Sequence, residues 1–408
     1  MSAPIDSARQ SGERPVPEAA SRLDFHAAHG GMFFELQRRL HLLHENALRT
    51  GKRALMFVAL AWGGLLVLVL PTYFSDKPMI WNFISDPGPS VRFIVGIAAF
   101  ILSEKYIDAG LRTKLLQFNR APLIAPSSQP KALSALNTAL KRRDSGTAEL
   151  ICLLLAIAGA YAAYVNFKSL PATNWSVTVS GSTPMLTPAG WWCVCFSSPL
   201  FLFLMFRGLW RHVVWARLLR MIAALELRLT ATHPDRKGGL AFLAEYPNAY
   251  VAFVFGLSSS IATVVAKHVW EDGLSANALA TVMIGWLLVV LIFFAYPLSA
   301  FTGPLSRLKR STVSVLSALA TRQQRTTERK IIGGNIAAPS KNETDYANGN
   351  PENLADYYSS VCKISTVLLS RNSLMPVCAS AILPFAIVGM TQLPFKEVFS
   401  VLKKILLV

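Results

Sequence analysis

Long apolar blocks alternate with polar segments along the chain. A transmembrane helix needs about 20 consecutive, mostly apolar residues, and six blocks approach or meet this length. We predict transmembrane helices over residues 54–74, 92–111, 150–167, 191–206, 250–266 and 278–301. Because backbone polar groups must be satisfied inside a bilayer, the predicted fold class is all-α: a polytopic transmembrane helical bundle with six to seven spans and amphipathic interfacial helices.

The second block is unusual because charges interrupt it. Its uncharged run, 93–103, is only 11 residues long and ends at Glu104 and Lys105. Runs of this length also occur in re-entrant segments. The sequence therefore leaves open whether 92–111 crosses the membrane completely.

A seventh apolar segment, 374–395, contains three prolines. Proline interrupts helical hydrogen bonding, so this segment either crosses the membrane or folds into a hairpin, and the side of the C-terminus depends on which. Residues 396–408 carry their charged side chains on one narrow arc, which predicts an amphipathic helix in the interface plane. Together these parts form a C-terminal unit over 374–408.

Lysine and arginine are distributed unevenly among the segments that flank the blocks. Four long segments hold seven to ten each: 1–53, 104–149, 207–249 and 303–373. The three short segments between them hold one each. Because Lys and Arg concentrate on the cytoplasmic side of membrane proteins, we predict that the N-terminus and all the long basic segments are cytoplasmic.

The segments outside the apolar blocks differ in regularity. Residues 1–31 are polar and contain proline and glycine, which predicts a disordered cytoplasmic tail. The membrane domain then extends over 32–302 and begins with an amphipathic helix at 32–49. The loop 303–373 is predicted to hold two cytoplasmic helices separated by a disordered stretch at 333–352.

Composition agrees with a membrane protein and restricts its partners. The chain has 408 residues, of which 52% are hydrophobic, a mean hydropathy of +0.40 and a net charge of +17. No recognition motif accompanies this charge, so nucleic acid binding is not expected. The basic segments instead predict contact with the bilayer and its anionic inner-leaflet lipids. A protein partner at the cytoplasmic face and an oligomer are left open.

The most distinctive polar segment is 232–240, Thr-His-Pro-Asp-Arg-Lys-Gly-Gly-Leu. Six of its residues form a candidate functional turn: His233, Asp235, Arg236, Lys237, Gly238 and Gly239. The side chains of the four charged or titratable residues could together hold a phosphate, a lipid headgroup or a nucleotide: His233, Asp235, Arg236 and Lys237. The alternative is a tight turn capped by Asp235, whose charges pair with each other and with lipid phosphates. We favour this alternative, because a single glycine pair is not a phosphate-binding motif.

Three acidic residues form a second candidate site. Glu104 and Asp108 are one helical turn apart in the second block, and Glu149 enters the third block from the same side. Carboxylates at membrane depth are costly and usually functional. The alternative is that Glu104 and Asp108 pair with Lys105 and Arg112 at the inner membrane boundary.

Metal and cofactor chemistry is not predicted. Two histidine pairs, His26/His29 and His41/His44, have a spacing that occurs in metal sites. No carboxylate or cysteine cluster accompanies them in the sequence, so we interpret them as solvated helix faces. No phosphate-binding loop, nucleophile elbow or HExxH motif is present, and an enzymatic role is therefore not favoured.

Several short segments together resemble a family of uncharacterised bacterial inner-membrane proteins. These segments are 140–145, Gly190-Trp191-Trp192, Ser198-Pro199-Leu200-Phe201, the basic run 207–217, the turn 232–240 and the helix from Pro394 to the end. The family typically reads His-Pro-Asp-Arg-Ala-Gly-Gly-Leu at the turn, where this chain has Lys237 in place of the alanine. The resemblance implies a multi-pass protein of the bacterial cytoplasmic membrane, and it implies no activity.

Three functions are compatible with these patterns. A non-catalytic scaffold or sensor would use the basic cytoplasmic segments to dock partners or anionic lipids, and it ranks first. A transporter or channel for a solute would use the spans and the proline-containing helices. A membrane enzyme acting on lipid-linked substrates would use His233, Asp235 and Glu104.

Overall fold

The computed structural model describes residues 23–42, 48–75, 77–168, 173–180, 183–272, 276–335 and 351–391. The predictions for residues 1–22, for most of the stretch 333–352 and for the helix at 396–408 lie outside the described residues. The predicted all-α class is confirmed. Within the described ranges the only sheet is a hairpin of strands β1 (Val177–Ser180) and β2 (Thr183–Leu186).

Six helices of the described chain are long and apolar enough to cross a membrane: Thr50–Val69, Gly146–Lys168, Pro188–Ala223, Ala241–Lys267, Asn277–Ile332 and Arg371–Met390. The protein is therefore a multi-pass membrane protein. The predicted span 92–111 is not among the six, because charged residues interrupt it. It forms part of one helix made of η2 (Val91–Gly96) and α7 (Ile97–Arg120).

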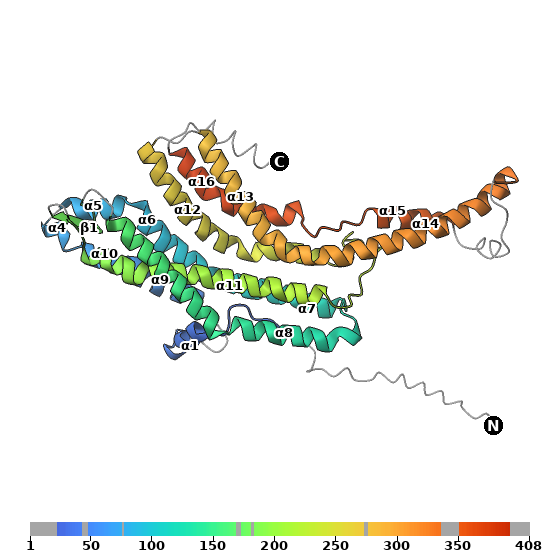
Figure 1. The fold of residues 1–408 in the computed structure, drawn as a ribbon, viewed down its shortest axis with the longest axis horizontal. Helices are drawn as coiled ribbons and strands as arrows, with labels where there is room; N and C mark the ends of the chain where they lie inside the picture. Colours follow the sequence, from blue (N-terminus) through green and yellow to red (C-terminus); the bar gives the residue numbers. More distant parts are fainter. Residues whose placement is uncertain are drawn as a thin grey trace, which may run out of the picture.

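A first group of helices surrounds α7. Helix α7 and the long helix α11 (Ser198–Ala223) run side by side along the long axis of the molecule (Figure 1). Their other neighbours are the first span, formed by α2 (Thr50–Val58), η1 (Ala59–Gly63) and α3 (Gly64–Val69), and the helices α8 (Gln129–Arg143) and α9 (Gly146–Lys168). Short elements cap one end of this group: α4 (Thr72–Ser75), α5 (Lys77–Ser85), α6 (Pro87–Ser90), α10 (Pro188–Trp192) and η4 (Cys193–Ser197).

A second group contains α12 (Val251–Asp272), α13 (Ala276–Leu298) and α16 (Arg371–Met390), which pack against one another (Figure 1). Helix α16 is continuous over the described part of the seventh apolar segment, with Pro376 and Pro384 inside it. The hairpin alternative is therefore wrong for residues 371–390. Membrane helices tolerate proline because neighbouring groups satisfy the freed backbone carbonyls.

Helices α14 (Thr302–Ile332) and α15 (Pro351–Cys362) lie at the other end of the molecule (Figure 1). Helix α14 follows α13 through η6 (Ser299–Phe301), and α15 packs along it. The helices η3 (Pro126–Ser128) and η5 (Ala241–Tyr250) precede α8 and α12. The amphipathic helix predicted at 32–49 is shorter in the structure, where α1 covers Met32–Arg39.

The N-terminal strap, residues 23–31, is ordered in the structure, so the predicted disorder is wrong for this part of 1–31. It is not helical, yet Leu23, Phe25, Ala27 and Ala28 are each at most 3% exposed within the bundle. These apolar residues are few and lie among polar neighbours, so the composition of the segment does not predict that they are buried. A few fully buried side chains nevertheless offset the cost of ordering a short extended segment.

Candidate functional site

Five charged side chains form a buried network inside the first helix group, which we call the arginine cluster. Glu104 of α7 lies at its centre, with Arg53 Nη1 2.8 Å from Oε2 and Arg207 Nη1 2.9 Å from Oε1. Arg211 Nη1 lies 3.6 Å from Oε1 of the same carboxylate. Arg207 also donates from Nε to Glu149 Oε1 at 3.1 Å. One arginine therefore bridges two of the predicted acidic residues.

The five members of the arginine cluster come from four helices that are far apart in the sequence. Arg53 lies in the first turn of α2, Glu149 in the first turn of α9, and Arg207 and Arg211 lie one turn apart on α11. The residues Arg53 and Arg207 are only 1% and 3% exposed. Buried charges are tolerated when they are paired, and the ion pairs of the cluster meet that condition.

The strap closes one side of the arginine cluster. Arg211 Nη2 donates to the carbonyl oxygen of Ala28 at 3.0 Å and approaches that of Gly30 at 3.4 Å. The backbone N–H of Phe33, just after the strap, donates to Glu149 Oε2 at 2.9 Å. The cluster thus holds α2, α7, α9, α11 and the N-terminal segment together.

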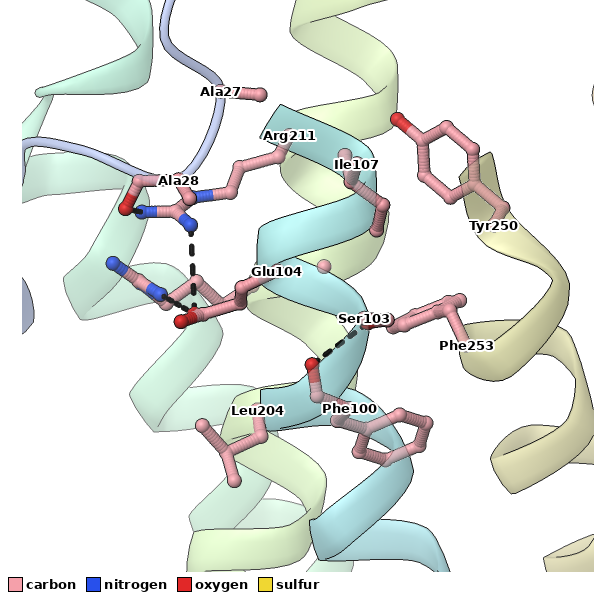
Figure 2. Close-up of a pocket in the computed structure, with 12 residues that line it drawn as sticks. Ala27, Ala28, Phe100, Ser103, Glu104, Ile107, Leu204, Arg211, Tyr250 and Phe253 are labelled. Atoms are coloured by element: carbon pink, nitrogen blue, oxygen red, sulfur yellow. Dashed lines mark hydrogen bonds and ion pairs between the residues drawn. The ribbon is translucent and has the colours of Figure 1, made fainter. Parts of the chain in front are cut away.

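A small cavity of about 30 Å³ lies beside Glu104 (Figure 2). Apolar side chains make up most of its wall, together with Ser103, whose hydroxyl donates to the Phe100 carbonyl at 2.7 Å. Tyr250 of η5 also lines it, and its buried hydroxyl makes no hydrogen bond to any described residue. A cavity of this size holds about one water molecule. In this conformation it is too small for a solute pathway.

The ion-pair partners proposed from sequence for the acidic residues are wrong. Glu104 pairs with three arginines instead of Lys105. Arg112 Nε binds Asp24 of the strap at 2.6 Å. Asp108 accepts from the Ala28 backbone N–H at 2.8 Å and faces two strap histidines.

Sequence reasoning missed the three arginines of the cluster. Arg53 was counted in the segment before the first span, and Arg207 and Arg211 in the loop after the fourth. A signal was nevertheless present in α11. Arg207 and Arg211 are four residues apart and continue at helical spacing to the fully buried Trp215. This periodicity extends the buried face of the helix past the end of its apolar run.

The turn 232–240 lies elsewhere, against the start of α14. Asp235 caps it by accepting the backbone N–H groups of Lys237 at 2.8 Å, Gly239 at 3.1 Å and Ala241 at 3.0 Å. His233 Nδ1 lies 2.8 Å from Asp235 Oδ1. Burial raises the pKa of Asp235, but the three backbone donors and His233 outweigh it and hold the pKa below its ordinary value.

The same turn fastens the segment that precedes α16. Lys237 Nζ donates to the carbonyl oxygens of Leu368 at 3.2 Å and Leu369 at 3.3 Å. The Ser365 backbone N–H donates to the Arg236 carbonyl at 2.9 Å. Burial lowers the pKa of Lys237 more than Asp235 raises it. The polar groups of this turn are therefore engaged in holding two loops together.

A substitution at Gly239 tests whether the turn needs a backbone conformation that only glycine adopts without strain. The φ angle of Gly239 is +93°, and an added Cβ would lie 3.3 Å from Leu123 Cδ2. We expect Gly239→Ala to lower the free energy of unfolding by about 1–3 kcal/mol, because only glycine adopts this backbone conformation without strain. Gly285→Ala is the matched control, since its Cβ would meet open space on α13. Equal stability of the two variants in detergent would contradict the prediction.

Comparison with known proteins gives no relative. No protein-family model, no curated protein and no solved structure matches the chain. The resemblance to an uncharacterised bacterial membrane family therefore stays a prediction, and function has to be argued from the geometry alone.

Proposed function

We propose that this protein is a non-catalytic membrane scaffold or sensor that docks an acidic protein on helix α14. The observation that carries the proposal is the continuation of an apolar helix into a basic one over Asn277–Ile332. Helix α14 carries seven Lys or Arg residues and one Glu, and Leu305 is its one fully buried residue. A helix with so little buried surface of its own is suited to binding a partner.

The arginines of α14 lie on one face. At about 100° per residue, five of them fall within an arc of about 120°: Arg307, Arg310, Arg322, Arg325 and Arg329. Exposed Ser314 and Ala318 occupy the middle of this face. Glu328 falls at the edge of the same arc, so the stripe holds five positive charges and one negative charge. A predominantly positive stripe favours a partner surface of the opposite sign and accelerates its association.

The placement of α14 favours a protein partner over a lipid surface. Figure 1 shows α14 extending away from both helix groups, accompanied by α15. Its 31 residues span roughly 46 Å at 1.5 Å rise per residue. Because charged residues recur along α14, we infer that most of its length lies beyond the membrane. On the positive-inside rule we place it in the cytoplasm.

The other two functions have less support from the geometry. A transporter needs a path for its solute, whereas the cavity beside Glu104 measures only about 30 Å³. A larger hollow of about 840 Å³ reaches Glu149, and its wall is mostly apolar. An enzyme using Asp235 would need that carboxylate free, whereas it is occupied by three backbone N–H groups. We also propose, from the resemblance and the charge distribution, that the membrane is the bacterial cytoplasmic membrane.

Site-specific photocrosslinking in cells tests the docking role. A photoreactive amino acid at Ser314 or Ala318 should form an adduct with one acidic protein. Arg307→Glu combined with Arg325→Glu should reduce that adduct roughly tenfold, because like-charge contacts replace attractive ones. Adducts with lipid alone would overturn the proposal in favour of a membrane-surface role.

Helix α8 provides the matched control for charge. Lys131 and Lys141 are exposed on α8, so Lys131→Glu with Lys141→Glu makes the same change in net charge on another surface. This variant should leave the α14 adduct unchanged. If both double variants reduce the adduct equally, binding depends on net charge and α14 is not the docking site.

A further inference from the structure

The junction between the strap and α7 brings together three side chains that bind metals. His26 Nδ1 lies 3.1 Å from Asp108 Oδ2, and His29 Nδ1 lies 3.5 Å from Asp108 Oδ1. One ligand atom from each of the three residues lies within 4.8 Å of the others. The histidines are on a non-helical strap, so their interpretation as a solvated helix face is wrong.

We propose that His26, His29 and Asp108 form a binding site for a divalent transition-metal ion of the zinc type. Zinc binds imidazole nitrogen and carboxylate oxygen at about 2.0–2.2 Å, which places tetrahedral ligand atoms roughly 3.3 Å apart. The two nitrogen–oxygen separations, 3.1 and 3.5 Å, are close to that value, but they run to different oxygens of Asp108, so the carboxylate has to turn one oxygen toward both nitrogens. The residues could therefore enclose an ion with small side-chain rotations.

The hydrogen bonding around the three residues also fits a metal site. His29 Nδ1 is buried and lies 3.5 Å from Asp108 Oδ1 without a hydrogen bond of normal geometry, so in the tautomer that carries its proton on Nε2 this nitrogen is available as a metal ligand. The Ala28 backbone N–H donates to Asp108 Oδ1 at 2.8 Å and fixes the carboxylate. His26 Nε2 faces Asp24 Oδ2 at 3.7 Å, which is the carboxylate–histidine arrangement that supports metal ligands.

Access and local charge permit an ion to enter. The side chains of His26 and His29 are 36% and 39% exposed, so an ion and a fourth, water ligand have room. Three arginines lie near the histidines, and each is already paired with a carboxylate. Arg112 binds Asp24, Arg143 binds Asp144, and Arg211 lies 3.6 Å from Glu104.

An ion at this site would act as a latch, by which we mean that it would fix the strap to helix α7. His26 and His29 flank Ala28, whose carbonyl accepts from Arg211 of the arginine cluster. Fixing both histidines to α7 would therefore hold the carbonyl against Arg211 and keep that side of the cluster closed. This inference is independent of the docking role of α14.

Metal titration of the full chain, purified in detergent without a polyhistidine tag, tests the site. After treatment with a chelator, we expect Zn²⁺ to bind with one equivalent per chain by calorimetry. Co²⁺ in its place should give the visible absorption of a tetrahedral complex. His26→Gln, His29→Gln and Asp108→Asn should each weaken Zn²⁺ binding by about tenfold or more, because each removes one of three protein ligands. His41→Gln, an exposed histidine outside the site, should bind as the unchanged protein does.

Hydrogen exchange of residues 23–31 provides a second readout. Zn²⁺ should slow exchange of the strap in the unchanged protein and in His41→Gln, and it should have no effect in His29→Gln. Absence of Zn²⁺ binding, or binding that all three ligand variants retain, would overturn the site. Binding without slower exchange of the strap would overturn the latch.

Discussion

Glu104→Ala is expected to lower the free energy of unfolding by about 3–5 kcal/mol, the cost of removing one partner from a buried ion pair. The substitution leaves Arg53 buried with its Nε already without a hydrogen bond to any described residue. In the variant, Arg207 retains its ion pair with Glu149, and Arg211 retains its hydrogen bond to the Ala28 carbonyl. Denaturant unfolding in mixed micelles, followed by tryptophan fluorescence, measures the loss.

Two further variants separate this effect from a general effect of charge. Glu245→Ala breaks the exposed pair with Lys114 and should cost less than about 1 kcal/mol. Glu104→Leu combined with Arg53→Leu should be more stable than Glu104→Ala, because removing both partners leaves no unpaired charge. If Glu104→Ala costs no more than Glu245→Ala, the cluster is open to water and the case against a solute pathway fails.

The fold class was predictable from the sequence because the length of each apolar run can be read directly from the residues. The blocks at 150–167 and 278–301 each fall within helices apolar enough to cross a membrane. Prolines made 374–395 ambiguous, because local sequence does not reveal which neighbouring groups satisfy the backbone. Packing of α16 against α12 and α13 decides that question, and it depends on residues far away in the chain.

The arginine cluster was only half predictable for a similar reason. Glu104 could be identified from the sequence because a carboxylate is rare within an apolar block. Its partners Arg53 and Arg207 lie beside other blocks, where arginine is expected on orientation grounds alone. The strap posed the same difficulty, since Phe25 is one apolar residue among polar neighbours and its burial depends on the shape of the bundle.

Asp235→Asn is expected to lower the free energy of unfolding by about 2 kcal/mol at neutral pH. Its carboxylate accepts three backbone N–H groups, and hydrogen bonds to a charged group contribute about 1.5–3 kcal/mol each before partial replacement by the amide oxygen and water. Because the turn also holds Ser365 and Leu368, exchange of residues 363–370 should accelerate in the variant. Asp356→Asn on α15, where the side chain is exposed, should change neither quantity.

The pH dependence of this difference identifies the carboxylate as its source. The pKa of Asp235 in the folded protein lies below its ordinary value of 3.8. A group with a depressed pKa contributes stability that is fully present above the unfolded pKa and is lost as pH falls through the folded pKa. The stability difference between the unchanged protein and Asp235→Asn should therefore be constant above about pH 5 and shrink below about pH 4. A difference that persists undiminished below that range would assign the effect to the shape of the amide, and the ionised cap would then not be what holds the turn.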